Sequence, residues 1–315
     1  MLSVLGDIPF LYIIVRKIAV HRFYMIVNSI NQKNKKIAVH LHIYYEDRWS
    51  EIVRYLTNLQ EYNYDLFVTL IKPNTELENK IKTFKSDTKI FIIDNIGYDI
   101  GAFIYFLHQI NLADYDYILK IHTKNTSRQD WTHINNFYLK NSEWNKLLWD
   151  SVLKNSKHID NIMSCLADKN IGMVSSRYLV TETLEDTKQV KDGCKKALLK
   201  LGFLEPMHMA FVPGTMFWVK SNLMEQIKKH FNQNDFEPSG SSGCDGSLAH
   251  IIERVLGYAI YARGQYIKGI GFELWATGLL IFRQTLRFIY QKKITSKGKL
   301  IIKVFKLPIY MKKVA

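Results

Sequence analysis

The sequence predicts an α/β protein in which helices flank a mostly parallel central sheet. Two observations support this fold class. Short apolar runs alternate with helix-like stretches between residues 36 and 121, the order expected for parallel strands joined by helices. A chain of 315 residues with 47% hydrophobic residues can also bury a large core. Ligands of such sheets bind at the carboxyl ends of the strands, so polar residues at those ends are the first candidates for function.

The expected elements can be placed in order along the chain. Strands are predicted at residues 36–45, 65–71, 89–93 and 116–121, with helices at 49–59, 74–84 and 99–110 between them. This alternation is typical of a doubly wound, Rossmann-type sheet. Further along, the pattern predicts an aromatic-rich, largely helical stretch after residue 125, strands at 171–175, 210–219 and 258–261, and helices at 181–201, 220–230 and 247–257.

The net charge of +14 favours an anionic partner, namely a nucleic acid, an anionic membrane surface or a phosphorylated substrate. Nucleic-acid binding is not expected, because the basic residues gather in the C-terminal region, 266–315, rather than in a recognition motif. There they alternate with apolar residues, which is typical of an amphipathic segment that lies on anionic lipid. A solvated basic face packed on its own domain is the alternative.

Neither end of the sequence carries an apolar run of the length that a membrane-spanning helix needs. The cysteines Cys165, Cys194 and Cys244 lack the spacing of a metal site or a disulfide framework, which favours a reduced compartment. We therefore expect a cytoplasmic protein in which residues 1–35 form an N-terminal extension close to a membrane.

A polar, glycine-bearing turn follows the strand predicted at 89–93 and contains Asn95, Gly97, Asp99 and Gly101. Glycines let backbone N–H groups approach a ligand closely, and the helix that begins near Asp99 directs its positive end to the same place. The turn is therefore a candidate site for a phosphate or for sugar hydroxyls. A loop held only by Asx turns is the alternative.

The strand predicted at 116–121 ends in three basic side chains, Lys120, His122 and Lys124. Fixed positive charge at this position can neutralise a diphosphate directly. The alternatives are a histidine bonded to the backbone and lysines on a solvated rim. On the first predicted strand, His40 and His42 are expected to face opposite sides, so at most one lines the pocket, and His42 is the candidate.

Five motifs occur in order at residues 39–45 (VHLHIYY), 95–101 (NIGYDIG), 120–124 (KIHTK), 214–218 (GTMFW) and 245–254 (DGSLAHIIER). Together they resemble the rhamnan synthesis F family of bacterial polysaccharide glycosyltransferases. The resemblance implies a GT-A-like fold over residues 36–265, with a nucleotide-sugar half at 36–125 and an acceptor half at 126–265. It also implies transfer of rhamnose or another hexose from a dTDP- or UDP-sugar to a lipid-linked or growing glycan. The glycan would be rhamnan, O-antigen or capsule, made at the inner face of the bacterial plasma membrane.

The chain departs from typical GT-A enzymes at the end of the fourth strand. Those enzymes carry Asp-x-Asp, which holds a divalent cation on the donor diphosphate. This chain has Lys120, His122 and Lys124 there instead. Two lysines and a histidine repel a cation, so we expect a metal-free mechanism. If Mn²⁺ or Mg²⁺ is used, Asp99 is the first candidate ligand.

An inverting transfer needs a carboxylate that accepts the proton of the acceptor hydroxyl. Asp245 is the first candidate, because it lies between glycines at the start of the helix predicted at 247–257. His250 and Glu253 lie three positions apart on that helix and could assist or replace it. Helix capping is the alternative role of Asp245.

Three further residues, Gly214, Trp218 and Arg254, are candidates for the acceptor site. Gly214 and Trp218 would shape its floor, although Trp218 can equally pack in the core. Arg254 can bind a phosphate or pair with Glu253. Because Asp-x-Asp is absent, a non-catalytic scaffold of a polysaccharide assembly complex is the alternative function. Nucleotide binding would distinguish an enzyme from such a scaffold.

Overall fold

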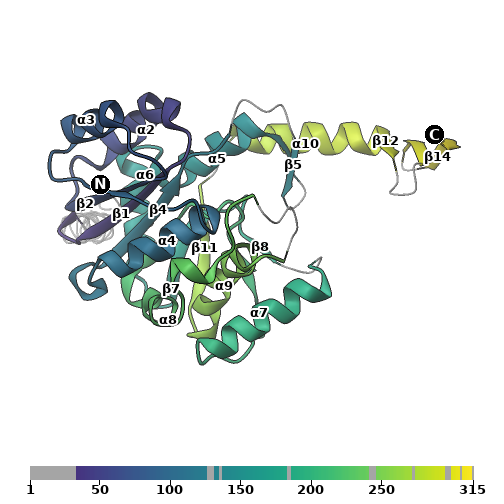
Figure 1. Cartoon of the computed structure of the whole chain (residues 1–315). Helices are drawn as coiled ribbons and strands as arrows, with labels where there is room; N and C mark the ends of the chain where they lie inside the picture. Colours follow the sequence, from purple (N-terminus) through teal and green to yellow (C-terminus); the bar gives the residue numbers. More distant parts are fainter. Residues whose placement is uncertain are drawn as a thin grey trace, which may run out of the picture.

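The computed structural model of the chain describes residues 33–125, 131–134, 137–182, 186–240, 246–271, 274–294, 299–305 and 307–313. A seven-stranded sheet runs through the centre of the body (Figure 1). Its strands, in sheet order, are β11 (Tyr266–Ile270), β7 (Ile171–Ser176), β10 (Phe217–Lys220), β4 (Tyr117–His122), β1 (Ile37–Ile43), β2 (Tyr64–Leu70) and β3 (Lys89–Ile92). Strand β10 is antiparallel to both of its neighbours, and the other pairs are parallel.

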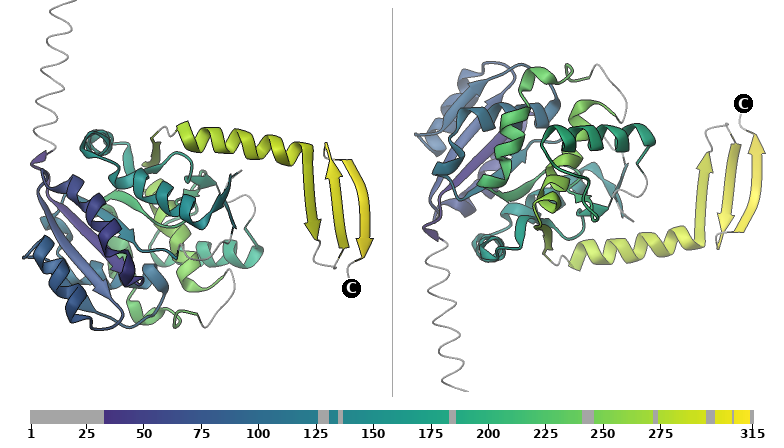
Figure 2. Two further views of the ribbon diagram at one scale, coloured as in Figure 1. Left: turned by 90° about the horizontal axis from the view of Figure 1, so that it is seen from above. Right: turned by 90° about the horizontal axis from the view of Figure 1, so that it is seen from below.

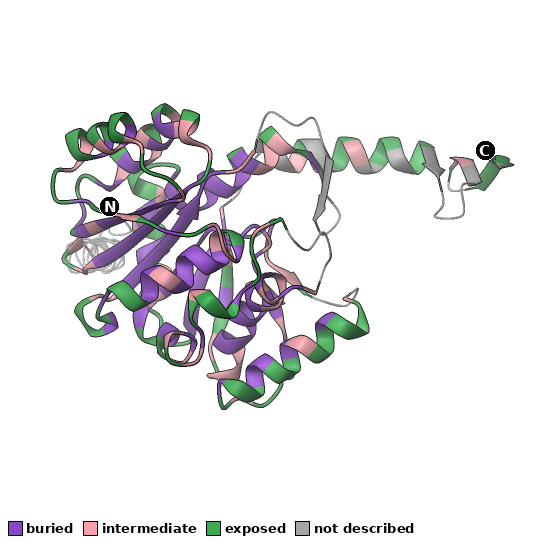
Figure 3. Cartoon of the chain, viewed as in Figure 1, coloured by how far each residue is buried: buried purple, intermediate pink, exposed green. Residues whose placement is uncertain are grey.

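Helices cover both faces of this sheet and bury two separate hydrophobic clusters against it. The first cluster involves α2 (Trp49–Leu56), α3 (Thr75–Phe84), α5 (Asn141–Leu153) and α6 (Ser156–Ala167). The second involves α4 (Tyr98–Gln109), α7 (Lys188–Lys200), α8 (Glu225–His230) and α9 (Leu248–Ala262). Figure 3 shows the buried strands between the two layers. The mostly parallel sheet flanked by helices is therefore confirmed.

The central strands form because their residues are apolar almost without interruption. All seven residues of β1 and all six of β4 are buried, as expected for strands covered on both faces. The helices instead bury one stripe, and in α3 this stripe is Leu77 and Ile81. That helix begins at Asn74, whose side chain accepts the backbone N–H of Leu77 at 3.0 Å.

The end of the central sheet differs from the prediction. The helix predicted to end at Gly257 continues to Ala262, so the strand predicted at 258–261 is wrong, and the last central strand is β11. Gly257 does not end the helix but lets it pack closely, since a Cβ there would lie 2.3 Å from the carbonyl oxygen of Ala210. Because β11 pairs with β7, the sheet also continues past residue 265, where the sequence predicts the domain boundary.

Two other segments are more broken than predicted. The strand expected at 210–219 is divided into β9 (Ala210–Phe211), which pairs with β8 (Thr181–Glu182), and β10. The intervening turn has positive φ at Gly214 (81°) and Thr215 (47°). Part of the expected helical stretch after residue 125 is a hairpin of β5 (Trp131–Ile134) and β6 (Phe137–Lys140).

Residues 274–313 extend away from the body (Figures 1 and 2). They comprise α10 (Leu274–Ile289) and an antiparallel sheet of β12 (Tyr290–Ile294), β13 (Lys299–Val304) and β14 (Leu307–Lys313). The C-terminal region is thus a helix followed by a small sheet rather than a tail. Across the described ranges, every helix is too short or too polar to cross a membrane. The N-terminal extension predicted at 1–35 lies outside the described residues except for its last three.

Replacing Gly257 by Ala is expected to lower the free energy of unfolding by about 1–3 kcal/mol, because the added Cβ meets backbone atoms that cannot move alone. The matched control is Gly278→Ala in α10, where no atom lies within 4 Å of the added methyl group. That control should be neutral or stabilising by up to about 1 kcal/mol. Urea denaturation measures both changes, and a Gly257→Ala protein as stable as the control would contradict the close contact of α9 with β9.

Candidate functional site

A cavity of about 520 Å³ opens at the carboxyl ends of β1 and β4. It lies where the sequence predicts binding, because the turn after β3 and the segments after β1 and β4 meet there. Its lining residues are His42, Tyr44, Tyr45, Asn95, Tyr98, Asp99, His122, Thr123, Lys124, Asn125, Asn141, Trp144, Ser239 and Gly240.

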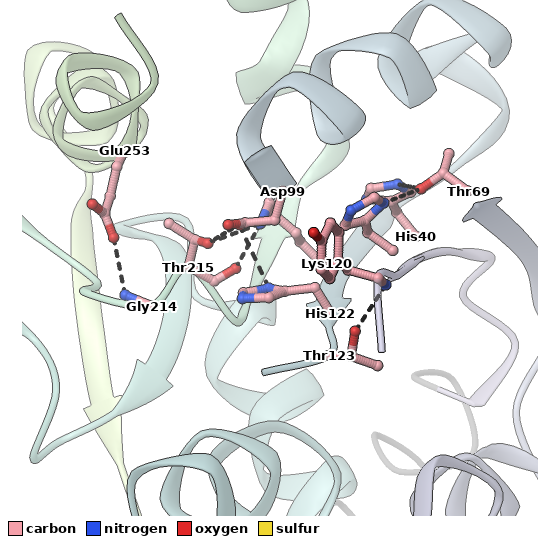
Figure 4. Close-up of polar contacts among 11 residues, drawn as sticks. His40, Thr69, Asp99, Lys120, His122, Thr123, Gly214, Thr215 and Glu253 are labelled. Carbon is pink, nitrogen blue, oxygen red and sulfur yellow. Dashed lines mark hydrogen bonds and ion pairs between the residues drawn. The ribbon is translucent and has the colours of Figure 1, made fainter. Parts of the chain in front are cut away.

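At one wall of this cavity, a buried ion pair joins three elements (Figure 4). The ammonium of Lys120 on β4 lies 2.5 Å from Oδ2 of Asp99 in the first turn of α4. It also donates to the carbonyl oxygen of Thr215 at 3.1 Å and to its hydroxyl at 2.9 Å. The Thr215 hydroxyl donates in turn to Asp99. These three acceptors use all the donors of the ammonium, so the expectation that Lys120 contacts a diphosphate is wrong.

The two glycines of the turn serve packing rather than ligand approach. Gly97 has φ of 69° and donates its N–H to the carbonyl of Glu237 at 3.0 Å. A Cβ at Gly101 would lie 1.9 Å from the carbonyl oxygen of Ile96. The N–H of Tyr98 is bonded to the Ser239 hydroxyl, so part of the positive end of α4 is already satisfied by the 237–239 loop.

His122 and Lys124 also line the cavity, and their nitrogens are not used up by acceptors of the described residues as those of Lys120 are. The His122 ring is buried, and neither of its nitrogens has a hydrogen-bond partner among the described residues. Its Nδ1 lies 3.5 Å from Oδ2 of Asp99. The Lys124 ammonium lies 4.5 Å from the centroid of the Trp144 ring, a cation–π contact at the cavity wall. The Lys124 ammonium is therefore placed where an anionic ligand can meet it, whereas the His122 nitrogens lie buried just behind the cavity wall.

Burial and charge set the ionisation of this cluster. Burial opposes the charge of Asp99, but His122, Lys120 and Lys124 outweigh it and hold the pKa of Asp99 well below its ordinary value. Burial lowers the pKa of His122 well below 6.5, although Asp99 acts in the opposite direction. Both directions are compatible with an ionised Asp99 beside a neutral His122, with Lys120 supplying the balancing charge.

His40 and His42 do not face opposite sides as predicted. Residues two apart on a strand share a face, and both rings reach the Thr69 hydroxyl, His40 through Nε2 at 3.1 Å and His42 through Nδ1 at 3.0 Å. His42 lines the cavity, whereas His40 stacks on Phe106 with the ring centroids 4.7 Å apart. The expectation that at most one of them reaches the cavity agrees with this arrangement, but its geometric reason was wrong.

The three candidates for the catalytic base, Asp245, Glu253 and His250, have different surroundings. Asp245 lies outside the described residues. Glu253 on α9 accepts the N–H of Gly214 at 3.0 Å, next to the Thr215 that holds Asp99 (Figure 4). Burial raises the pKa of Glu253, and the charge of Asp99 adds to the rise. His250 pairs through Nδ1 with the Ser247 hydroxyl at 2.8 Å.

Two of the three candidate acceptor residues are already engaged. Trp218 is fully buried and its indole N–H donates to the Val152 carbonyl at 3.0 Å, so it packs in the core and offers no face to a sugar. Arg254 pairs with both carboxylate oxygens of Asp186 at 2.9 Å, rather than with Glu253. Gly214 has a positive φ that its turn requires, and it joins α9 to the site through Glu253.

Sequence reasoning missed several contributors to the site, and three of them illustrate why. Thr215 lies within a quoted motif, but nothing in the sequence indicated that it would hold Lys120 and Asp99. Trp144 and Ser239 reach the cavity from segments far along the chain. An aromatic residue in a predicted helix and a serine in a predicted loop give no signal of such placement.

Among the described residues, the cluster at the end of β4 offers few ligands for a divalent cation. Within the described ranges, no three or more His, Cys, Asp or Glu side chains are grouped as metal ligands. The one carboxylate at the end of β4, Asp99, already binds an ammonium and a hydroxyl through Oδ2. The metal-free mechanism stays a prediction.

Stability is expected to fall as the pH is lowered from about 6.5 to about 4. Burial lowers the pKa of His40 and His122, and it lowers that of His42 to about 4. The unfolded chain takes up protons near pH 6.5 while the buried imidazoles stay neutral, so acid favours unfolding by up to about 1.4 kcal/mol per pH unit for each histidine. Urea denaturation at about pH 7.5 and about pH 5 measures the difference.

The matched variants are His42→Gln, which keeps a polar group near Thr69, and His208→Gln on the surface. The first should reduce the loss of stability in acid, because one suppressed protonation site is gone. The second should leave the loss unchanged. An identical pH dependence in the wild type and His42→Gln would show that the buried imidazole does not contribute.

Comparisons with known proteins identify the relatives of the chain. The protein WxcX of Xanthomonas campestris pv. campestris is 23% identical over 180 residues in both strain B100 and strain ATCC 33913. The match covers 56% of this chain and 24% of WxcX, so the chain spans about a quarter of the length of the curated relatives that it matches.

Two solved structures are similar at 10% identity. The mannosyltransferase PcManGT from Pyrobaculum calidifontis, in complex with GDP-Man and Mn²⁺, has a TM-score of 0.39 and covers 87% of this chain and 74% of its own. A mycobacterial protein has a TM-score of 0.38 and covers 91% and 89%. The profile of the rhamnan synthesis protein F family matches residues 8–265 of the 315. The resemblance is thereby confirmed, and the chain belongs to the rhamnan synthesis protein F family.

Proposed function

We propose that the chain is a glycosyltransferase that moves a sugar from a nucleotide-sugar donor to a growing polysaccharide. Membership of the rhamnan synthesis protein F family supports the polysaccharide product. The observation that carries the proposal is the cavity at the carboxyl ends of β1 and β4, which combines cationic, acidic, amide and aromatic side chains. A nucleotide sugar needs these groups together, for its diphosphate, its sugar hydroxyls and its base.

In this proposal, the donor diphosphate binds at Lys124 and His122. Lys124 supplies a cation whose orientation is supported by the ring of Trp144. His122 has two ring nitrogens without a partner in the described part of the chain, so it can donate a hydrogen bond to a phosphate oxygen. Asp99, Asn95 and Asn125 line the same cavity and can bond to hydroxyls of the sugar or the ribose.

Among the described residues, Glu253 is the carboxylate that we favour as the base, because it accepts the N–H of Gly214 beside the Thr215 that holds Asp99. Its pKa is raised mainly by burial, which makes it a stronger proton acceptor than an exposed glutamate. The acceptor hydroxyl would give its proton to Glu253 while its oxygen bonds to the anomeric carbon, and the bond from that carbon to the diphosphate would break. Asp245 stays a second candidate for the same role. The nucleoside diphosphate leaves with the electron pair and stays near Lys124.

The donor that we favour carries rhamnose or another hexose on dTDP or UDP. The acceptor would be a lipid-linked or growing glycan at the inner face of the plasma membrane, as in the synthesis of rhamnan, O-antigen or capsule. Inversion at the anomeric carbon is part of the proposal, because a single carboxylate base serves one direct displacement.

Transfer is expected to proceed in EDTA. A panel of dTDP-, UDP- and GDP-sugars, incubated with extracted lipid-linked glycan, should give product or donor hydrolysis for at least one sugar. Protein cations, Lys124 first among them, would take the place of a metal. Loss of activity in EDTA with recovery in Mn²⁺ or Mg²⁺ would overturn the metal-free part, and Asp99→Asn would then be the first variant to study. No turnover and no thermal shift with any nucleotide would favour a scaffold instead.

Glu253→Gln is expected to lower kcat by about two to four orders of magnitude. The amide oxygen can still accept the N–H of Gly214, so folding and the Kd for the nucleoside diphosphate should change little. The matched variant is Asp245→Asn, assayed with the same donor. A loss below about tenfold in Glu253→Gln, with a large loss in Asp245→Asn, would assign the base to Asp245.

A further inference from the structure

The C-terminal unit, which comprises α10, β12, β13, β14 and the turn residue Phe305 between the last two strands, exposes apolar side chains that a soluble domain usually buries. Eighteen large hydrophobic side chains are exposed in the described residues, and eleven of them lie in this unit. They are Ile281, Phe282, Leu286, Phe288, Ile289, Tyr290, Phe305, Leu307, Ile309, Tyr310 and Met311. So dense a group of apolar side chains marks an interaction surface.

At β14, the edge strand of the small sheet, neither face is covered. Ile309 is 63% exposed, and the adjacent Tyr310 is 46% exposed. Successive residues of a strand point to opposite faces, so both faces of the sheet at β14 are open to solvent. A three-stranded sheet gains its stability by packing one face against something else. The partner of this sheet is therefore to be sought outside the body.

The positive charge of the same region favours one kind of partner over the others. Residues 274–315 contain ten Lys or Arg residues and no Asp or Glu, so they supply ten of the fourteen net positive charges. A second copy of the unit would bring the same charge, which opposes self-association. The phosphates of a nucleic acid would pair with the lysines, but they would not bury the exposed apolar side chains of Leu307, Ile309 and Met311. An anionic bilayer satisfies both kinds of side chain at once.

The unit is fixed to the body beside the cavity. Arg283 of α10 pairs with both carboxylate oxygens of Glu143 at 2.8 and 3.0 Å. The Thr277 hydroxyl lies 2.8 Å from that of Tyr178. Glu143 is the residue before Trp144, which lines the cavity. The contact that holds the C-terminal unit thus lies one residue along α5 from the cavity wall.

We infer that the C-terminal unit is a docking surface for an anionic lipid bilayer, in which its aliphatic and aromatic side chains enter the interface and its lysines meet the headgroups. This surface is separate from the chemistry of the cavity, so its test does not depend on transferase activity. It would hold the cavity at the membrane, where lipid-linked acceptors are found.

The test is co-sedimentation of the full chain with vesicles of phosphatidylcholine, with and without phosphatidylglycerol. Binding should require phosphatidylglycerol and weaken as NaCl rises from about 0.1 M to about 1 M, because salt screens the lysines. Ile309→Ser with Met311→Ser should weaken binding by about tenfold or more, since less apolar surface enters the interface. These side chains are exposed, so the variant should fold, and circular dichroism checks this.

A second variant removes the charge. Lys303→Glu with Lys312→Glu should also weaken binding by about tenfold or more. Two controls make the same chemical changes on the body. Leu204→Ser with Met207→Ser removes exposed apolar groups there, and Lys195→Glu with Lys196→Glu alters the net charge equally. Both controls should bind vesicles like the wild type.

Three results would overturn the inference. They are no vesicle binding at low salt, equal binding to vesicles with and without phosphatidylglycerol, and equal effects of the C-terminal variants and the body controls. A duplex DNA or RNA that binds at the same salt, and that competes fully with vesicles, would instead assign the surface to nucleic acid. Nucleotide thermal shifts on the same variants show that the cavity is unaffected, so a failed docking test leaves the proposed transferase standing.

Discussion

The candidate site depends on the buried ion pair between Lys120 and Asp99. An ammonium removed from water is stable only when its charge is balanced and its donors are satisfied. Asp99 supplies the charge, and Thr215 supplies two further acceptors. The pair therefore fixes β4, the start of α4 and the turn before β10 relative to one another. Through Gly214, the same turn also fixes Glu253.

Much of the fold could be predicted because the central strands are mostly apolar, and the helices between them carry one apolar stripe. The errors arose where local signals pointed to the wrong structure. Gly257 resembles a helix end in the sequence, but it is needed for contact with Ala210, a residue far away along the chain. The hairpin of β5 and β6 contains aromatic residues that fit a helix or a strand equally well.

The site could be located from the sequence, but the roles within it could not. Asn95, Asp99, His122 and Lys124 do line one cavity, because the ends of neighbouring parallel strands meet. Whether a basic side chain is free or paired depends on partners distant in sequence. Arg254 forms an ion pair with Asp186, and Lys120 forms one with Asp99. Neither pair could be predicted from the spacing of these residues in the sequence.

The basic residues of this chain fall into three groups with different surroundings, and the net charge of the chain does not distinguish these groups. Lys120 is internal, and its charge is cancelled by Asp99, so it shapes the site without adding attraction for an anion. Lys124 and His122 line the cavity, to which they contribute one positive charge and one neutral ring. The lysines and arginines after residue 273 have no acidic residue among them, and apart from Arg283, which pairs with Glu143, their field acts outward. A chain whose body is nearly neutral can in this way hold a strongly basic surface without disturbing the balance of charge in its cavity.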